Sequence, residues 1–233
     1  MALVIVLAFY YFFYIISTGR LQKLKIDQRN PSMNNLRQEW KHTIISLLIF
    51  LLVGILMDQL QLRGYSRIYF QPGDFPWWYT VLSVPGLFLL YDAYFYFMHR
   101  LLHTGIFFRK VHIIHHKFHS PNPVTAYAFH PVEAIFQIGF LPLVMAVLPL
   151  YQGVLYFFVA FLFVVSTYGH LGFELRAGKK GMFKIFNTAI HHYLHHKNVH
   201  YNFGFYLNFW DKIFGTNDPD YFAKMERFRK GLD

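Results

Sequence analysis

The sequence has no cysteine and few charged residues, and each scarcity excludes common functions. Without cysteine the chain can form no disulfide, iron–sulfur cluster or thiolate-bound zinc site, so any metal must be held by nitrogen and oxygen ligands. Charged residues make up 15% of the 233 positions and hydrophobic residues 55%, whereas soluble domains are about 25% charged. These proportions indicate a membrane protein.

Acidic residues are especially scarce, with 12 Asp and Glu against 22 Lys and Arg, a formal net charge of +10. In a soluble chain this excess would suggest nucleic-acid binding. Here the basic residues lie beside apolar runs, where cytoplasmic anchoring and attraction to anionic lipid explain them better. We therefore expect no nucleic-acid partner.

Five apolar runs predict an all-α integral membrane protein with about four to five transmembrane helices. A membrane span needs about 20 apolar residues, with about 17 as the lower limit. The first run lacks a basic segment before it and a cleavage site after it, so we interpret it as a retained membrane helix. Pro149 and Gly153 predict a tight turn between the last two. The runs cover residues 2–17, 43–57, 77–97, 132–148 and 151–168.

The charged loops predict the orientation of these helices. Six basic residues separate the first two runs, and the positive-inside rule places that loop in the cytoplasm. All histidine clusters then fall on the cytoplasmic face, in a bacterial inner membrane or the endoplasmic reticulum, while Trp77 and Trp78 mark the opposite interface. The six are Arg20, Lys23, Lys25, Arg29, Arg37 and Lys41.

We expect one membrane-embedded domain over residues 1–233. It comprises the first membrane helices (1–97), two histidine clusters (98–131), a helical hairpin (132–168) and a cytoplasmic helical cap with the last cluster (169–233). Basic residues of the cap could dock an acidic electron carrier or lipid headgroups, although a solvated positive surface explains them more simply. They include Lys179, Lys180 and Lys184.

All histidines except His42 lie between His99 and His200, and most occur at spacings of one, three or four. Residues i, i+3 and i+4 share one face of a helix, so each cluster can direct two or three imidazoles at one point. Neutral imidazole binds iron, zinc, copper and nickel, and eight or more are too many for one ion. The clusters therefore predict two metals. The three clusters are His99 with His103, His112 with His115 and His116, and His191 and His192 with His195 and His196.

Several other residues are candidates for an additional ligand or for a partner of one. His130 and His170 lie at the two ends of the predicted hairpin, where the alternative is an interfacial role, and His200 follows the last cluster. His191 points about 100° away from the ligand face. Asp92 lies two turns before His99 in an apolar run, and we expect it to orient a ligating imidazole; the alternative is an ion pair with Lys or Arg.

The motifs from about residue 90 to residue 216 resemble the fatty acid hydroxylase/sterol desaturase superfamily. The resemblance includes the three histidine motifs, the segment 123–133 and the segment 201–216, which contains Asn202. Within the superfamily the chain looks most like sterol delta-5 desaturase (lathosterol oxidase)-type proteins and related bacterial members.

The resemblance implies two irons, with zinc as the metal that could replace them on isolation, O2 as oxidant and a lipid substrate from the bilayer. It implies hydroxylation or desaturation of a sterol, fatty-acyl or sphingoid lipid. Electrons would come from a separate b-type cytochrome or ferredoxin-like protein and its reductase, fed by NAD(P)H. The implied ligands are His99, His103, His112, His115, His116, His170, His192, His195 and His196.

Three alternatives stay open. Within the superfamily, the chain could be an ether-lipid or carotenoid monooxygenase. From other classes, it could be a membrane metal transporter or a non-catalytic zinc-binding membrane protein. The sequence leaves the lipid, the carbon attacked, the electron donor and the oligomeric state open.

Overall fold

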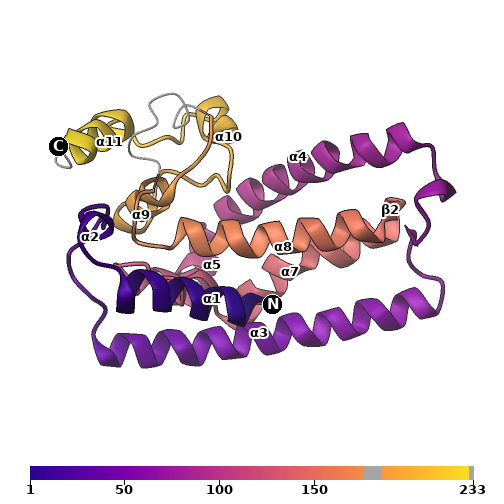
Figure 1. Ribbon diagram of the computed structural model, residues 1–233, viewed down its shortest axis with the longest axis horizontal. Helices are drawn as coiled ribbons and strands as arrows, with labels where there is room; N and C mark the ends of the chain where they lie inside the picture. Colours follow the sequence, from indigo (N-terminus) through magenta and orange to yellow (C-terminus); the bar gives the residue numbers. More distant parts are fainter. Residues whose placement is uncertain (176–184, 231–233) are drawn as a thin grey trace.

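The structure, a computed structural model, describes residues 1–175 and 185–230 as a mostly helical chain (Figure 1), which confirms the predicted helical class. Lys179, Lys180 and Lys184 lie outside the described residues. The longer helices are α1 (Ala2–Tyr10), α3 (Met33–Leu62), α4 (Trp77–Leu102), α7 (Pro131–Val147), α8 (Gln152–Gly169), α9 (Ala189–Lys197) and α11 (Tyr221–Lys230).

Short elements connect these helices. A π-helical turn, η1 (Tyr11–Ile16), continues α1, and a second, η3 (Phe108–His112), lies between two histidine motifs. The remaining elements are α2 (Arg20–Lys23), β1 (Ile68–Tyr69), η2 (Pro72–Asp74), α5 (Gly105–Phe107), α6 (Ile113–His116), η4 (Thr125–Tyr127), β2 (Leu150–Tyr151) and α10 (Phe209–Ile213).

Three helices, α3, α4 and α8, are long and apolar enough to cross a membrane. The other two predicted spans form shorter apolar helices, Ala2–Ile16 and Pro131–Val147, and both contact the longer helices along their length. Apolar side chains such as Leu48, Leu51 and Leu52 remain exposed on α3. Such exposed apolar surface is what a bilayer covers, so the chain is a membrane protein.

Helix α3 begins ten residues before the apolar run that predicts it. Ser32 accepts a hydrogen bond from the backbone N–H of Asn35 and so caps the first turn. The added turns bring Glu39 to the segment before α7, where it accepts from Asn122 and Thr125. Thr43, the first residue of the run, donates to the carbonyl of Val124 at 2.8 Å. This N-terminal extension fixes α3 against the histidine-bearing end of the molecule.

A short turn separates the last two apolar helices, since α7 ends at Val147 and α8 starts at Gln152. In the turn, β2 pairs in parallel with β1 from the loop between α3 and α4. Both strands have two residues, too few for a sequence signal. They join the two loops at the end of the bundle away from α9, on the right of Figure 1.

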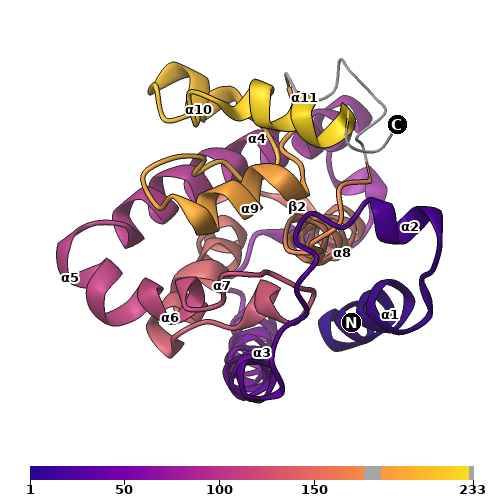
Figure 2. The same cartoon turned by 90° about the vertical axis from the view of Figure 1, so that its left-hand side faces the viewer.

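The C-terminal elements gather at the opposite end. Helices α9, α10 and α11 lie together over one end of α8 and α4 (Figure 2). Ile190 of α9 packs against Tyr221 and Met225 of α11 in a small separate core. This layer brings α9 to the ends of α4 and α8. Whether all of this forms one domain, as predicted, stays a prediction.

Candidate metal centre

Nine buried or half-buried imidazoles meet where α4, η3, α6, α8 and α9 converge. They form two groups, and within each group one potential ligand atom from every residue lies within 4.8 Å of the others. The first group is His99, His103, His112, His116 and His195; the second is His115, His170, His192 and His196. The structure thus brings together all nine predicted ligands, in two places.

Each of the two longer motifs is divided between the groups, which differs from the expectation that one motif points at one position. His112 and His116 belong to the first group and His115 to the second. The last motif mirrors this, since His192 and His196 belong to the second group and His195 to the first. Adjacent helical residues differ by about 100°, so positions i+3 and i+4 diverge. Helices α6 and α9 therefore each serve both groups.

The imidazole nitrogens are spaced as ligands of one ion would be. In the first group, His116 Nε2 lies 3.1 Å from both His112 Nε2 and His195 Nε2. In the second, His170 Nε2 lies 3.2 Å from His115 Nε2 and 2.8 Å from His192 Nε2. Metal–nitrogen bonds of about 2.0–2.1 Å place neighbouring ligand atoms about 3 Å apart. The residues therefore fit a metal in each group.

Backbone carbonyls orient several rings. His99 Nδ1 donates to the carbonyl of Phe203 at 2.9 Å, His195 Nδ1 to that of Tyr201 at 2.6 Å, and His170 Nδ1 to that of Ser166 at 2.8 Å. A proton held on Nδ1 leaves the Nε2 lone pair free for a metal. These bonds select the tautomer that coordination through Nε2 requires.

Glu133 is the one carboxylate among the described residues that bonds to a ring of the two groups. Its Oε1 accepts from His112 Nδ1 at 2.8 Å, and both side chains are fully or almost fully buried. The sequence does not predict this role for Glu133, which enters only as part of the segment 123–133. The feature that could have indicated it is an acidic residue in the first turn of an apolar helix, three residues after His130.

Burial keeps these imidazoles neutral. It lowers the pKa of His103 to about 2 and that of His170 to about 4. The pKa values of His112, His115 and His116 lie well below the ordinary value, first because of burial and then because neighbouring imidazoles repel a second positive charge. The same holds for His192, His195 and His196. Neutral imidazole is the form that binds metal.

Three other candidate histidines lie outside both groups. His130 caps α7, its Nδ1 accepting from the backbone N–H of Val132. His200 is exposed beyond α9. His191 is fully buried, and its Nε2 lies 3.3 Å from Asp211 Oδ2. It lies on the side of α9 that faces away from both imidazole groups. Asp211 also accepts from the amides of Phe203 and Gly204, so His191 supports the loop that orients His99.

The prediction that Asp92 orients a ligating imidazole is wrong. Asp92 accepts hydrogen bonds from backbone amides instead. Its Oδ1 accepts from Tyr206 at 3.1 Å and Leu207 at 3.3 Å. Asn202, in the left-handed conformation, donates to the His191 carbonyl and accepts from the amide of Asp218. Both residues hold the 202–208 segment in place and act on the imidazoles only through it.

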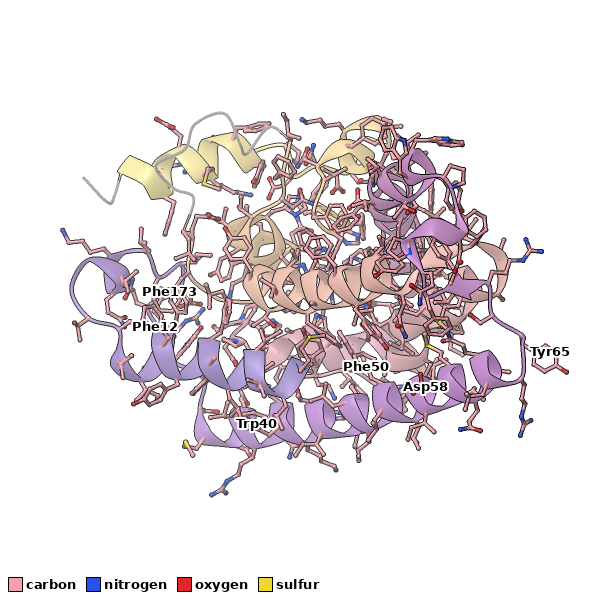
Figure 3. All side chains as sticks on the ribbon, turned by 45° about the vertical axis from the view of Figure 1, so that its right-hand side comes forward. Phe12, Trp40, Phe50, Asp58, Tyr65 and Phe173 are labelled. Carbon is pink, nitrogen blue, oxygen red and sulfur yellow. The ribbon has the colours of Figure 1, made fainter. Side chains whose placement is uncertain are left out.

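Three neighbouring apolar cavities lie between the helices, and the innermost contains imidazoles of both groups. A groove of about 660 Å³ lies between α1, α3, α7 and α8. Phe50 and Val159 line both this groove and an inner cavity; Figure 3 labels Phe50, which packs at 6.4 Å against Tyr127. Gln137 and Phe205 line the inner cavity and the one containing His99, His112, His115, His170 and His192. The three cavities are therefore neighbours that share walls.

The fold and the site define a membrane protein with a histidine-rich candidate dimetal centre. Residues 84–216 match the family model described as fatty acid hydroxylase. The chain belongs to the fatty acid hydroxylase/sterol desaturase superfamily, which confirms the resemblance noted in the sequence. No solved structure matches it.

Curated relatives agree with this membership. The chain is 32% identical over 186 residues to a lathosterol oxidase of Rattus norvegicus, covering 78% of this chain and 61% of the relative. It is 28% identical over 218 residues to a methylsterol monooxygenase 1 of Gallus gallus, covering 90% and 71%. A Delta(7)-sterol 5(6)-desaturase of Leptosphaeria maculans is 26% identical over 194 residues, covering 78% and 50%. The chain thus spans about 61% of the lathosterol oxidases it matches.

Proposed function

We propose that the protein is a membrane-bound, non-haem di-iron oxidoreductase that uses O2 to hydroxylate or desaturate a lipid. The observation that carries the proposal is the pair of imidazole groups at the inner end of an apolar cavity. The nine imidazoles would hold two irons, and such a centre supplies the oxidant for an unreactive C–H bond. Zinc also suits imidazole ligands, but it has no redox chemistry.

The chain's own residues would prepare this site in three ways. The carbonyls of Phe203, Tyr201 and Ser166 hold rings with Nε2 available. Glu133 fixes His112 and balances part of the positive charge of the bound metals. The aromatic walls formed by Phe95, Phe129 and Phe205 exclude water from the cavity, which protects a strong oxidant from side reactions.

The neighbouring apolar cavities support a lipid substrate. Their outer groove opens between membrane helices, where a lipid can enter sideways from the bilayer, and the inner cavities are narrow. The printed names of the relatives concern sterols. We therefore place a sterol first among the substrate classes, followed by fatty-acyl and sphingoid lipids.

The proposed location is a bacterial inner membrane or the endoplasmic reticulum, with the metal centre on the cytoplasmic face. The basic loop between the first two apolar helices supports this orientation, since Arg29 of this loop lines the same cavity as Lys197 of α9, and Asp27 of the loop pairs with Lys197. Electrons would come from a separate carrier protein and its NAD(P)H-dependent reductase.

A transporter is less well supported. Transporters place polar ligands along a path through the bilayer, whereas the imidazoles of both groups lie at or beyond the C-terminal ends of α4 and α8. Metal uptake into vesicles containing the protein would favour that alternative.

The test is O2 consumption by the iron-loaded protein in detergent, with lathosterol-type sterols and then fatty-acyl lipids as substrates. We expect substrate-dependent O2 uptake and an oxidised lipid detected by mass spectrometry. His115→Ala should abolish both, whereas Arg63→Ala, at the exposed end of α3, should not. Turnover near the normal rate in His115→Ala would contradict the proposal.

A further inference from the structure

Another cavity, of about 600 Å³, lies apart from the three apolar cavities and is also lined by imidazoles; here it is called the second cavity. Its walls come from the segment 29–32, the first turns of α3, the segment 116–120 and the C-terminal end of α9 with Val199 beyond it. It shares no lining residue with the apolar cavity that contains His115 and His192. The candidate metal centre thus separates two cavities of different chemistry.

One imidazole from each group lines this second cavity. His116 belongs to the first group and His196 to the second. Their rings are stacked with centroids 4.7 Å apart, and each side chain is 2% exposed. The Nδ1 atoms, on the ring edge away from the metal-facing Nε2, have no hydrogen-bond partner among the described residues. A molecule in this cavity would therefore approach both groups at once.

The rim of the cavity is basic. Arg29, Lys117 and Lys197 line it and are exposed. The nearby Asp27 pairs with Arg29 at 2.7 Å and with Lys197 at 3.8 Å, but its side chain is only 13% exposed. Glu39 also lines the cavity, and it is buried. Three exposed cations thus outnumber the carboxylates that an approaching molecule would meet.

Apolar side chains also line this cavity, together with these cations and the two imidazoles. Phe108, Ile113 and Val199 line the cavity and are partly exposed. A charged rim around a small apolar contact is typical of transient protein interfaces, in which charges steer the encounter and apolar contact completes it. The surface suits the exposed edge of another protein's prosthetic group.

We propose that this basic cavity is the docking surface for an acidic one-electron carrier protein and the point at which electrons enter. The inference rests on the proposed function and names the surface that its partner uses. Desaturation consumes the lipid, one O2, two electrons and two protons and yields the alkene and two waters; hydroxylation yields the alcohol and one water. Two carriers are each oxidised by one electron in either reaction, so the carrier must reach the centre while lipid fills the other cavity.

Binding can be tested without turnover. The zinc-loaded protein in an uncharged detergent is titrated with an acidic soluble b-type cytochrome, and the Kd is measured at low and high salt. We expect salt to weaken binding and Lys117→Glu to raise the Kd at least tenfold. Arg63→Glu is the control, because it also reverses an exposed charge but lies at the C-terminal end of α3. The 30 residues of α3 place that end about 45 Å from the first turn, which lines the basic cavity. Arg63→Glu should therefore change the Kd less than twofold.

Electron transfer provides the second measurement. In the iron-loaded protein, Lys117→Glu should slow reduction by the cytochrome at least tenfold but leave reduction by a small neutral reductant unchanged. Equal effects of Lys117→Glu and Arg63→Glu, or no effect of either, would overturn the proposal. So would a Lys117→Glu defect seen only in binding to anionic lipid vesicles, because the surface would then contact lipid headgroups. Iron that neither reductant reduces would count against the proposed function instead, since cytochrome binding is measured separately.

Discussion

At the residue scale, the candidate site depends on what lies behind each imidazole as much as on the imidazoles themselves. Carbonyls and Glu133 occupy the Nδ1 side of four rings. Such partners fix the tautomer and the orientation of a ligating ring, and their loss typically weakens metal binding ten- to a hundredfold.

Glu133→Gln should weaken metal binding by about that ten- to hundredfold factor, because the amide cannot hold His112 as the carboxylate does. Competition with a chelator would measure the affinity. Glu39→Gln is the matched control: Glu39 is also buried, but it accepts from Asn122 and Thr125. If both variants lost metal equally, the effect would reflect general destabilisation and not the bond to His112.

Acid should destabilise the metal-free protein. Burial lowers the pKa of His170 to about 4, whereas an unfolded histidine titrates near 6.5. Below about pH 6.5 the unfolded chain therefore binds protons that the folded chain excludes, so stability is complete above that pH and falls as the pH approaches 4. Thermal unfolding between pH 8 and pH 5 would test this, and a midpoint that stays constant or rises on acidification would contradict it.

At the scale of elements, the five apolar runs predict helices and the tight hairpin, because those features depend on local composition and turn residues. The angle between neighbouring helical residues explains why each longer motif is divided between the two groups. Which histidines meet in each group also depends on the positions of α4 and α8, which the sequence does not give. Long-range partners leave no local signal. Asp92 accepts from amides 114 and 115 residues later in the sequence. Its position two turns before His99 predicts an imidazole partner only because the sequence does not show this contact.

Asp92→Ala should remove the contact between α4 and the 203–208 segment and destabilise the protein by about 2–3 kcal/mol, since buried amides lose their acceptor. Metal content should fall as well, because the Phe203 carbonyl that orients His99 belongs to this segment. Thermal unfolding and elemental analysis would measure both. Asp58→Ala, which removes an exposed acid from α3 (Figure 3), should change neither; equal behaviour of the two variants would contradict the role of Asp92.

At the scale of the whole molecule, the two imidazole groups lie between a series of neighbouring apolar cavities among the membrane helices and a basic cavity on the other side. Under the proposed function, this arrangement would separate the route of a lipid from the route of electrons. Composition predicts a membrane protein and motif spacing predicts two metals, but neither shows the cavities, because their walls combine helices far apart in the sequence.

Val159→Trp should lower lipid turnover at least tenfold while leaving metal content unchanged, since Val159 lines both the outer groove and the inner cavity. Val164→Trp is the matched control on the same helix, because Val164 is 42% exposed on its outer side. Product formation from a lipid in vesicles would be compared for the two. Equal rates would show that substrate reaches the centre by another route.

The most direct test of the two-metal centre is the metal content of the detergent-purified protein, measured by elemental mass spectrometry. We expect close to two metal ions per chain, preferably iron. We expect loss of about one ion in His170→Ala, which affects only the second group, and no loss in His200→Ala, which removes an exposed imidazole outside both groups. A folded protein without metal, or a His170→Ala variant that retains both ions, would contradict the two-metal centre.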